Sequence, residues 1–162
     1  MPFQAKIEEK MMNNKSKLVH NLNFDLPAAA EYVVVARLAV SGIASRMDFT
    51  IEEIEDIKIA VSEACTNCVQ HAYLNQPQEG RISIKCDIYE DKLYISISDT
   101  GKGFDLSLLG SEIQRENSET NLGLGLGLTF VKSLMDESDF QSELGKGTTI
   151  SMAKYKPSTN TD

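Results

Sequence analysis

Apolar and polar positions alternate in several short stretches of the chain, and this spacing predicts β-strands. The stretches are residues 22–26, 82–88, 93–97, 138–143 and 148–155. Pro27 ends the first of them, and Glu90 with Asp91 separates the second from the third, which predicts a hairpin. The pattern therefore predicts a sheet in which hairpins dominate.

Helical spacing of apolar residues connects these strands. It predicts a helix from Ala28 to Met47, and Thr50 with Glu53 forms a capping box that opens a second helix running to about Tyr73. A third helix is expected over 129–135, after a polar, irregular segment over 104–122 and a glycine run. The order of elements predicts an α+β two-layer sandwich, with a mixed but mainly antiparallel sheet covered by helices on one face.

Length and composition fit one globular domain. The chain has 162 residues, of which 41% are hydrophobic and 25% charged. We expect a flexible arm over 1–20, a folded domain over 21–156 and a disordered tail over 157–162. No apolar run approaches the ~18 residues of a membrane span, and the N-terminus does not resemble a secretory signal, which predicts a cytoplasmic protein without membrane contact. The net charge of −8 argues against nucleic acid as a direct partner.

The three cysteines predict packing rather than metal chemistry. Cys65 and Cys68 have C-x-x-C spacing, but both fall on the core stripe of the second helix, and only Cys86 is left as a further thiol. We therefore interpret them as buried free cysteines, with a zinc or redox pair as the alternative.

Glu63 and Asn67 lie one turn apart on the second helix, at the margin of its apolar stripe. Carboxylate and amide oxygens are ligands that Mg²⁺ accepts together with water and substrate phosphates. From this helix alone, a solvated polar flank is the more economical interpretation.

Two polar residues on apolar strand faces change that balance. Asp99 continues the parity of Leu93, Ile95 and Ile97, and Thr148 shares the parity of the inward residues of the last strand. A carboxylate and a hydroxyl at such positions suit the floor of a pocket for a planar ligand with hydrogen-bond donors, such as adenine. A hydrogen bond between the two residues within the fold is the alternative.

Glycines occur directly after the strand that ends at Asp99 and directly before the expected third helix. Gly101 and Gly103 come directly after a strand, where the backbone turns sharply or approaches a ligand. Gly123, Gly125 and Gly127 precede the expected third helix, and free amides at a helix N-terminus bind phosphate. The chain has neither a Walker A pattern nor G-x-G-x-x-G after its first strand.

The ordered set of motifs is more specific than any one of them. E-x-x-x-N on a helix, D-x-G-x-G after a strand, G-x-G-x-G before a helix and a final G-T resemble the N, G1 and G2 boxes of GHKL (Bergerat-fold) ATPases. Residues 59–73, 133–137 and 147–149 further resemble the anti-sigma serine kinases of the RsbW type and their sporulation relatives, over roughly 22–155. Those proteins are homodimers that hold a sigma factor and phosphorylate a serine on a STAS-domain anti-anti-sigma partner.

The resemblance implies roles for individual residues. It makes Asn67 the Mg²⁺ ligand, Asp99 the contact to the adenine amino group with help from Thr148, and Glu63 the general base. Arg37 matches an arginine that faces the protein partners, and a plain surface arginine is the alternative. The residues implied around ATP or ADP are Gly101, Gly103, Gly123, Gly125, Leu126, Gly127 and Leu128.

Some features depart from the family pattern. The G1 box is fuller than RsbW proteins usually carry, and Gly123 replaces an arginine that the sporulation type has there, which leaves Arg115 as a loose candidate for the γ-phosphate contact. A sensor histidine kinase is disfavoured because His20 and His71 do not lie on a long dimerising helix. The remaining alternative is a nucleotide-binding anti-sigma module that transfers no phosphate.

Overall fold

The structure, a computed structural model, describes residues 16–72, 80–103 and 119–158. Its helices and strands are β1 (Leu18–Pro27), α2 (Ala30–Ala44), α3 (Ile51–Asn67), a π-helical turn (Cys68–Ala72), β2 (Arg81–Tyr89), β3 (Lys92–Asp99), α5 (Glu119–Leu134), β4 (Glu137–Glu143) and β5 (Gly147–Tyr155). The strands form one sheet in the order β1-β2-β3-β5-β4, and every pairing in it is antiparallel.

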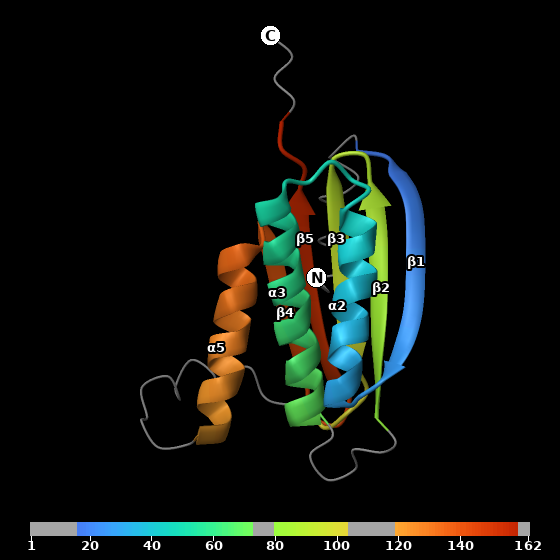
Figure 1. Ribbon diagram of the computed structural model, residues 1–162. Coiled ribbons are helices and arrows are strands. Elements are labelled where there is room, and N and C mark those ends of the chain that lie inside the picture. Colours follow the sequence, from blue (N-terminus) through green and yellow to red (C-terminus); the bar gives the residue numbers. More distant parts are fainter. Residues whose placement is uncertain (1–15, 73–79, 104–118, 159–162) are drawn as a thin grey trace.

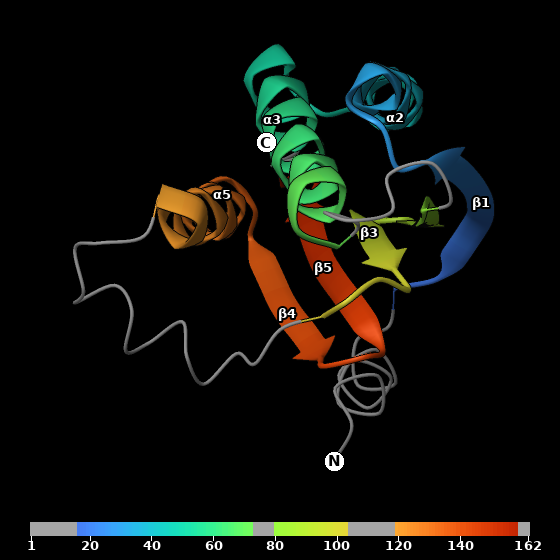
Figure 2. The ribbon, with the colours of Figure 1, turned by 90° about the horizontal axis from the view of Figure 1, so that it is seen from below.

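Helices cover one face of this sheet. Figures 1 and 2 show α2 running beside β1, α3 over the middle of the sheet and α5 beside β4. The core lies between the two layers, where inward isoleucines of β2, β3 and β5 meet the apolar stripes of α2 and α3. Ile84, Ile97 and Ile150 lie in register across the three strands and are almost fully buried. The predicted two-layer α+β sandwich is confirmed, with a wholly antiparallel sheet among the described strands.

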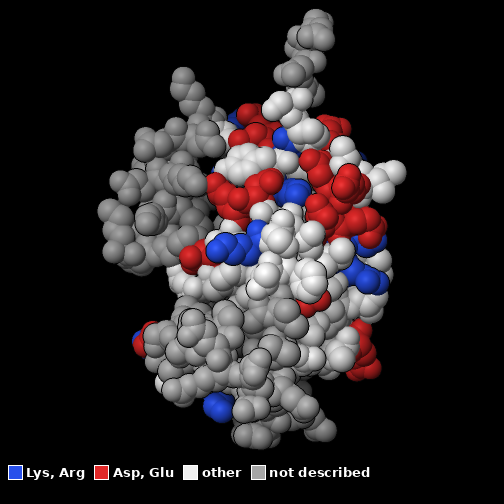
Figure 3. All heavy atoms as spheres, turned by 90° about the vertical axis from the view of Figure 1, so that its left-hand side faces the viewer, with Lys and Arg blue, Asp and Glu red and all other residues white. Residues whose placement is uncertain are grey.

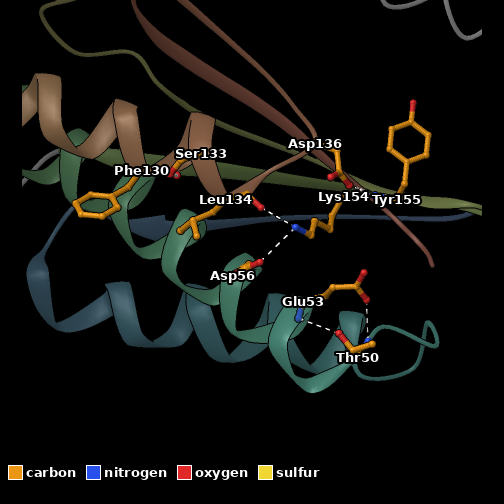
Figure 4. Close-up of polar contacts among 9 residues, drawn as sticks. All are labelled: Thr50, Glu53, Asp56, Phe130, Ser133, Leu134, Asp136, Lys154 and Tyr155. Atoms are coloured by element: carbon orange, nitrogen blue, oxygen red, sulfur yellow. Dashed lines mark hydrogen bonds and ion pairs between the residues drawn. The ribbon is translucent and has the colours of Figure 1, made fainter.

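The capping box of α3 is confirmed in full. The Thr50 hydroxyl accepts a hydrogen bond from the Glu53 amide at 3.1 Å, and the Glu53 carboxylate accepts one from the Thr50 amide at 2.8 Å (Figure 4). The α-helix ends at Asn67 instead of continuing to Tyr73, because the next five residues form the π-helical turn. Such single π turns are frequent at functional sites.

The first strand is longer than the sequence pattern predicted. It begins at Leu18, so residues 18–20 belong to the sheet and not to an N-terminal arm. A register shift between Leu18 and His20 interrupts the alternation of side chains, and this irregularity hides the strand from a period-two search. The rest of the expected arm, residues 1–15, lies outside the described residues. At the other end, Pro157 and Ser158 lie in neither helix nor strand, and 159–162 lie outside the description.

The last helix also differs from the prediction. We expected the glycine run to be a loop before a helix at Thr129, but α5 begins at Glu119, so Gly123, Gly125 and Gly127 lie inside the helix. Leu128, Val131 and Met135 are buried at helical spacing, which accounts for how the helix packs on α3. Glycine inside a helix costs about 1 kcal/mol relative to alanine. That cost is not large enough to end this helix, so the predicted loop is wrong.

Lys154 holds the end of α5 to the rest of the domain. Its side chain is largely buried, and its ammonium group donates to the Leu134 carbonyl at 2.7 Å and lies 3.4 Å from the Asp56 carboxylate of α3 (Figure 4). A cation at the C-terminal carbonyls of a helix also complements its dipole. One side chain of β5 thereby fixes α5 against α3.

The two ends of the described domain meet at one hairpin. The Glu90 amide donates to the Lys17 carbonyl at 3.0 Å, and the Lys156 amide donates to the Asp91 carbonyl at 2.8 Å. Beside them the Lys92 ammonium group lies between the rings of Tyr89 and Tyr155, 5.3 and 5.2 Å from their centroids. This hairpin lies at the end of the sheet opposite Asp99.

Acidic side chains dominate part of the surface, as the net charge of −8 requires. Figure 3 shows many Asp and Glu side chains over the upper half of one face, with Lys or Arg side chains among them. Among the described residues, no helix has the length and apolar character that crossing a membrane requires.

Lys154→Met should lower the free energy of unfolding by about 1–3 kcal/mol, because a partly buried carbonyl and a carboxylate lose their donor. Urea denaturation measures the change. Lys146→Met is the control: that lysine pairs with Glu143 at the surface, where we expect about 0.5 kcal/mol or less. Equal losses in the two variants would contradict a fixing role for Lys154.

Candidate nucleotide-binding site

Asp99 ends the central strand with its side chain directed into the helix-covered side of the sheet. It is only 7% exposed, opposite Ile82 of β2. Its Oδ1 accepts hydrogen bonds from the Gly101 amide at 2.9 Å and from the Thr148 amide at 3.3 Å. Both of these backbone hydrogen bonds go to the same oxygen, so Oδ2 keeps capacity to accept from a ligand.

The environment of this carboxyl group acts in two directions. Burial raises the pKa of Asp99 above its usual value, while the Gly101 amide, the Cys68 thiol and the Thr148 amide each lower that pKa by donating hydrogen bonds. The donors therefore compensate for the loss of water around the carboxylate. Sequence reasoning found Asp99 and Thr148 and did not find Cys68.

Two glycines lock the loop after Asp99 to the β4–β5 hairpin. Gly147 has φ +97°, and a Cβ atom on it would lie 2.1 Å from the Asp99 carbonyl oxygen. Gly103 has φ +63°, and its Cβ would lie 2.1 Å from the Glu143 carbonyl oxygen. The Gly145 amide completes the contact by donating to the Lys102 carbonyl at 2.8 Å. No other residue type fits at either position, so the backbone around Asp99 is fixed by close packing.

Thr148 lies beside Asp99, as predicted, but its hydroxyl has a partner that was not anticipated. The Oγ1 of Thr148 lies 2.8 Å from the Oγ of Ser142 on the neighbouring strand, and Ser142 also donates to the Gly147 carbonyl at 3.2 Å. The alternative of a hydrogen bond within the fold is thus correct for the Thr148 backbone. Because the one Ser142 proton goes to the Gly147 carbonyl, Thr148 donates to Ser142, and both hydroxyl oxygens keep capacity to accept.

Glu63 and Asn67 face the glycine run of α5. A Cβ atom on Gly127 would lie 3.2 Å from both Glu63 Oε2 and Asn67 Oδ1, and 3.4 Å from Asn67 Nδ2. The 3.2 Å distances are tighter than ordinary van der Waals contact, so glycine lets α5 approach both polar groups without displacing them. The structure therefore brings together the carboxylate, the amide and the glycine that the sequence placed in three separate motifs.

The amide of Asn67 is buried and incompletely paired. It is 7% exposed, and its Nδ2 has no hydrogen-bond partner, although an unpaired buried donor costs about 1–3 kcal/mol. This cost is understandable if the amide serves a ligand. The described residues contain no cluster of three or more His, Cys, Asp or Glu that could cage a metal ion. A cation held by one amide oxygen together with water and phosphate fits this donor set, as Mg²⁺ does.

For the remaining candidate site residues, the structure gives the position in the fold but few or no side-chain contacts. Leu128 is buried on α5 and Arg37 is exposed on α2. Gly123, Gly125 and Leu126 lie in α5, but their surroundings are not described, and Arg115 lies outside the described residues. Cys65, Cys68 and Cys86 are buried and free, which confirms the packing interpretation; burial raises the pKa of Cys65 and Cys86 to about 12.

Ser142 and Cys68 are the site-adjacent residues that sequence reasoning did not find. Ser142 carries no motif, and its position opposite Thr148 depends on the register of two strands. Cys68 directly follows Asn67, and this position was the available signal that it lies near the site. Its C-x-x-C spacing with Cys65 was instead considered only as a possible metal or redox motif.

A buried acceptor at a strand end, an amide–carboxylate pair and a glycine-lined helix define a nucleotide-binding domain of the histidine kinase type. The model of the histidine kinase-like ATPase domain matches residues 26–154. In sequence, the chain is 43% identical to the serine-protein kinase RsbW of Bacillus subtilis over 138 residues, which covers 83% of this chain and 84% of that protein. It is 47% identical to RsbW of Staphylococcus aureus (strain MRSA252) over 134 residues, covering 80% and 83%. The chain belongs to the RsbW family of serine-protein kinases.

Solved structures agree on the fold. The RsbU and RsbW domains of a Mycobacterium tuberculosis protein superpose with a TM-score of 0.62 at 19% identity, covering 86% of this chain and 34% of that longer one. The SiaB–SiaC complex from Pseudomonas aeruginosa gives a TM-score of 0.56 at 15% identity, covering 93% and 96%. Identities this low carry information about the fold alone.

Gly147→Ala and Gly145→Ala form a matched test of the glycine lock. Both positions have positive φ, but a Cβ on Gly145 meets nothing within 4 Å. Gly145→Ala should cost about 1–2 kcal/mol of stability from backbone strain. Gly147→Ala should cost a further ~1–3 kcal/mol from the clash and should weaken ATP binding, because the Asp99 backbone must shift. Thermal unfolding and calorimetric titration with ATP measure both effects, and equal behaviour of the two variants would contradict the lock.

Proposed function

We propose that this RsbW-family kinase is an anti-sigma factor that binds and inhibits an RNA polymerase sigma factor and uses Mg-ATP to phosphorylate a serine on a STAS-domain anti-anti-sigma protein. The observation that carries the proposal is the meeting of Glu63, Asn67 and Gly127 in one contact. Such control by exchange of partners takes place in the cytoplasm, where sigma factors act. The acidic net charge accords with protein partners in place of nucleic acid.

The chain's own groups divide the chemistry between two ends of the site. Asp99 Oδ2 accepts a hydrogen bond from the amino group of adenine, and the hydroxyl pair of Thr148 and Ser142 offers further acceptor oxygens beside it. At the other end, Glu63 accepts the proton of the partner's serine hydroxyl as its oxygen bonds to the γ-phosphorus, while the bond to the bridging oxygen breaks and ADP leaves. Phosphoryl transfer depends mainly on positioning and on neutralising charge, so this small set of groups is sufficient.

Asn67 is the residue that would hold Mg²⁺, through its amide oxygen. The ion supplies neutralisation of the phosphate charge when it is bound. Asn67 lies one helical turn after Glu63, so α3 sets the separation between the metal ligand and the base. The π-helical turn that begins directly after Asn67 contacts β3, the strand that ends at Asp99.

The glycine run of α5 acts at the phosphates through its backbone. These residues are helical in the structure, and amides inside a helix are hydrogen-bonded to carbonyls one turn earlier. Phosphate binding by Gly123, Gly125 and Gly127 therefore requires the first turns of α5 to open. Three glycines lower the cost of that opening by about 1 kcal/mol each relative to alanine.

The protein partners are the finer part of the proposal. One similar structure contains RsbU and RsbW domains, and another is a complex of SiaB with SiaC. By analogy, this chain would engage its sigma factor and its STAS-domain antagonist through the surface that includes Arg37. Arg37 is exposed on the α2 helix, and among the described residues no ion pair engages it.

A homodimer accords with the apolar surface at one edge of the molecule. Helix α2 and the edge strand β1 lie side by side there (Figures 1 and 2). Leu38 is the most exposed of their large apolar residues, at 58%. The others are Leu18, Val19, Leu22, Val34 and Val35. An edge strand bordered by exposed apolar side chains is a surface that a second copy of the chain can cover.

Glu63→Gln should lower the rate of phosphate transfer to a STAS-domain substrate by about 10²- to 10⁴-fold while ATP affinity is retained, because only the proton acceptor is lost. Labelled ATP with phosphoserine detection measures transfer, and calorimetry measures binding. Asn67→Ala should instead weaken Mg-ATP binding with the fold intact. Glu52→Gln, at an exposed position on the same helix, is the control. Tight sigma binding without any transfer by the wild-type chain would favour the binding module instead.

Arg37→Ala should weaken binding of the sigma factor by about tenfold or more, since arginines at interface centres often dominate affinity. ATP affinity should not change, because Arg37 lies on α2, away from the described nucleotide contacts. Co-purification of the host's sigma factors with the tagged full chain, followed by titration, measures this. Arg46→Ala, at an exposed position just beyond α2, is the matched control, and equal loss in both variants would remove the specific role of Arg37.

A further inference from the structure

Ser142 is the outermost member of a row of polar side chains at one end of the sheet. It lies on β4 directly opposite Thr148 of β5, and the Thr148 amide in turn donates to the Asp99 carboxylate of β3. Three neighbouring strands thus each place a polar side chain on the helix-covered face. The next residues inward on the same three strands are apolar: Ile97, Ile150 and Phe140. The polar row therefore coincides with the floor of the proposed adenine site.

Hydrogen bonds within the row set the direction of each hydroxyl proton. The Ser142 hydroxyl donates to the Gly147 carbonyl at 3.2 Å, and its oxygen lies 2.8 Å from the Thr148 oxygen. A serine hydroxyl has one proton, so the proton in the second contact belongs to Thr148 and points toward Ser142. Thr148 consequently presents oxygen lone pairs, and not its proton, to a ligand beside it.

The row therefore offers a ligand acceptors, and its three side chains offer no donor. Oδ2 of the ionised Asp99 carboxylate can accept, and so can the Thr148 oxygen. The amino group of adenine has two N–H donors, which suit two acceptors. Guanine and hypoxanthine carry an oxygen at the same ring position, and that oxygen finds no donor in the row. A site built to accept from a ligand N–H group strongly disfavours an analogue that lacks it.

We infer that Ser142 is a positioning residue: it holds the proton of Thr148 away from the ligand and so sets the preference of the site for adenine over 6-oxopurines. The inference rests on the proposed ATP site. Ser142 acts through Thr148 and does not itself have to touch the base. The Gly147 carbonyl is part of the same arrangement, because it takes up the Ser142 proton that would otherwise compete for the contact with Thr148.

Removal of the Ser142 hydroxyl should change the choice of ligand and not only its affinity. Without that acceptor, the Thr148 hydroxyl is free to rotate and to donate to the oxygen of a 6-oxopurine. A side chain that served strand pairing alone would behave differently. Its loss would lower the folded fraction and weaken the binding of both kinds of nucleotide by the same factor.

The test is the ratio of ATP affinity to ITP affinity, measured by calorimetric titration of the full chain. Ser142→Ala should lower this ratio by roughly threefold to tenfold, the value of about one hydrogen bond gained by the 6-oxo group. Ser142→Thr keeps a hydroxyl group and should restore the wild-type ratio. Both titrations use one preparation of each variant, so a reduced folded fraction cancels in the ratio.

Ser138→Ala is the matched control. Ser138 lies on the same strand and the same face, is half-buried, and is opposite Met152, two inward positions away from Ser142. Its removal should leave the ratio of the two affinities unchanged. An equal fall in Ser138→Ala and Ser142→Ala would overturn the inference.

A double-mutant cycle tests whether Ser142 acts through Thr148. In a Thr148→Val background no hydroxyl proton is left to redirect, so Ser142→Ala should no longer change the ratio. An unchanged ratio in Ser142→Ala alone, or the same fall with and without the Thr148 hydroxyl, would overturn the inference while leaving the ATP site in place. Failure of the wild-type chain to bind ATP would refute the proposed function, and the inference with it.

Discussion

The carboxylate of Asp99 is held at the end of the central strand, away from most of the water that would stabilise it. Burying such a charge without partners is costly, and the surrounding backbone supplies those partners. Gly101 and Thr148 direct their amides at one oxygen, and they can do so because Gly103 and Gly147 let the loop and the hairpin approach within contact distance. The close packing of this corner is therefore a requirement of the ligand site and not only of the fold.

The position of α3 extends this constraint to the phosphate end. The helix begins at a capping box and ends at a π-helical turn, so its last residues are fixed relative to the sheet. Glu63 and Asn67 project from it toward Gly127, while Lys154 holds the far end of α5 against the same helix. One helix thus sets the spacing between Asp99 and the Glu63–Asn67 pair, the two ends of the proposed site, and its buried stripe keeps that spacing fixed.

Much of this arrangement could be predicted from the sequence because it depends on local periodicity. The parity that sends Asp99 inward and the helical spacing that pairs Glu63 with Asn67 are properties of single elements. Two features escaped for physical reasons. The register shift near His20 breaks the alternation of side chains by which a strand is predicted. The glycine run was interpreted as a loop, but it is helical, and buried Leu128 and Val131 stabilise the helix by packing. The pairing of Ser142 with Thr148, and of Cys68 with Asp99, depends on tertiary contacts that no local pattern encodes.

The hairpin where Lys17 and Lys156 are both anchored has a consequence for how such a domain can be used. The polypeptide enters and leaves the sheet at neighbouring points, on the edge remote from the ligand corner. A domain with adjacent ends can be spliced between or beside other modules with little disturbance of its interior. This geometry suits a domain whose two connections to other parts of a protein run side by side, far from its ligand corner.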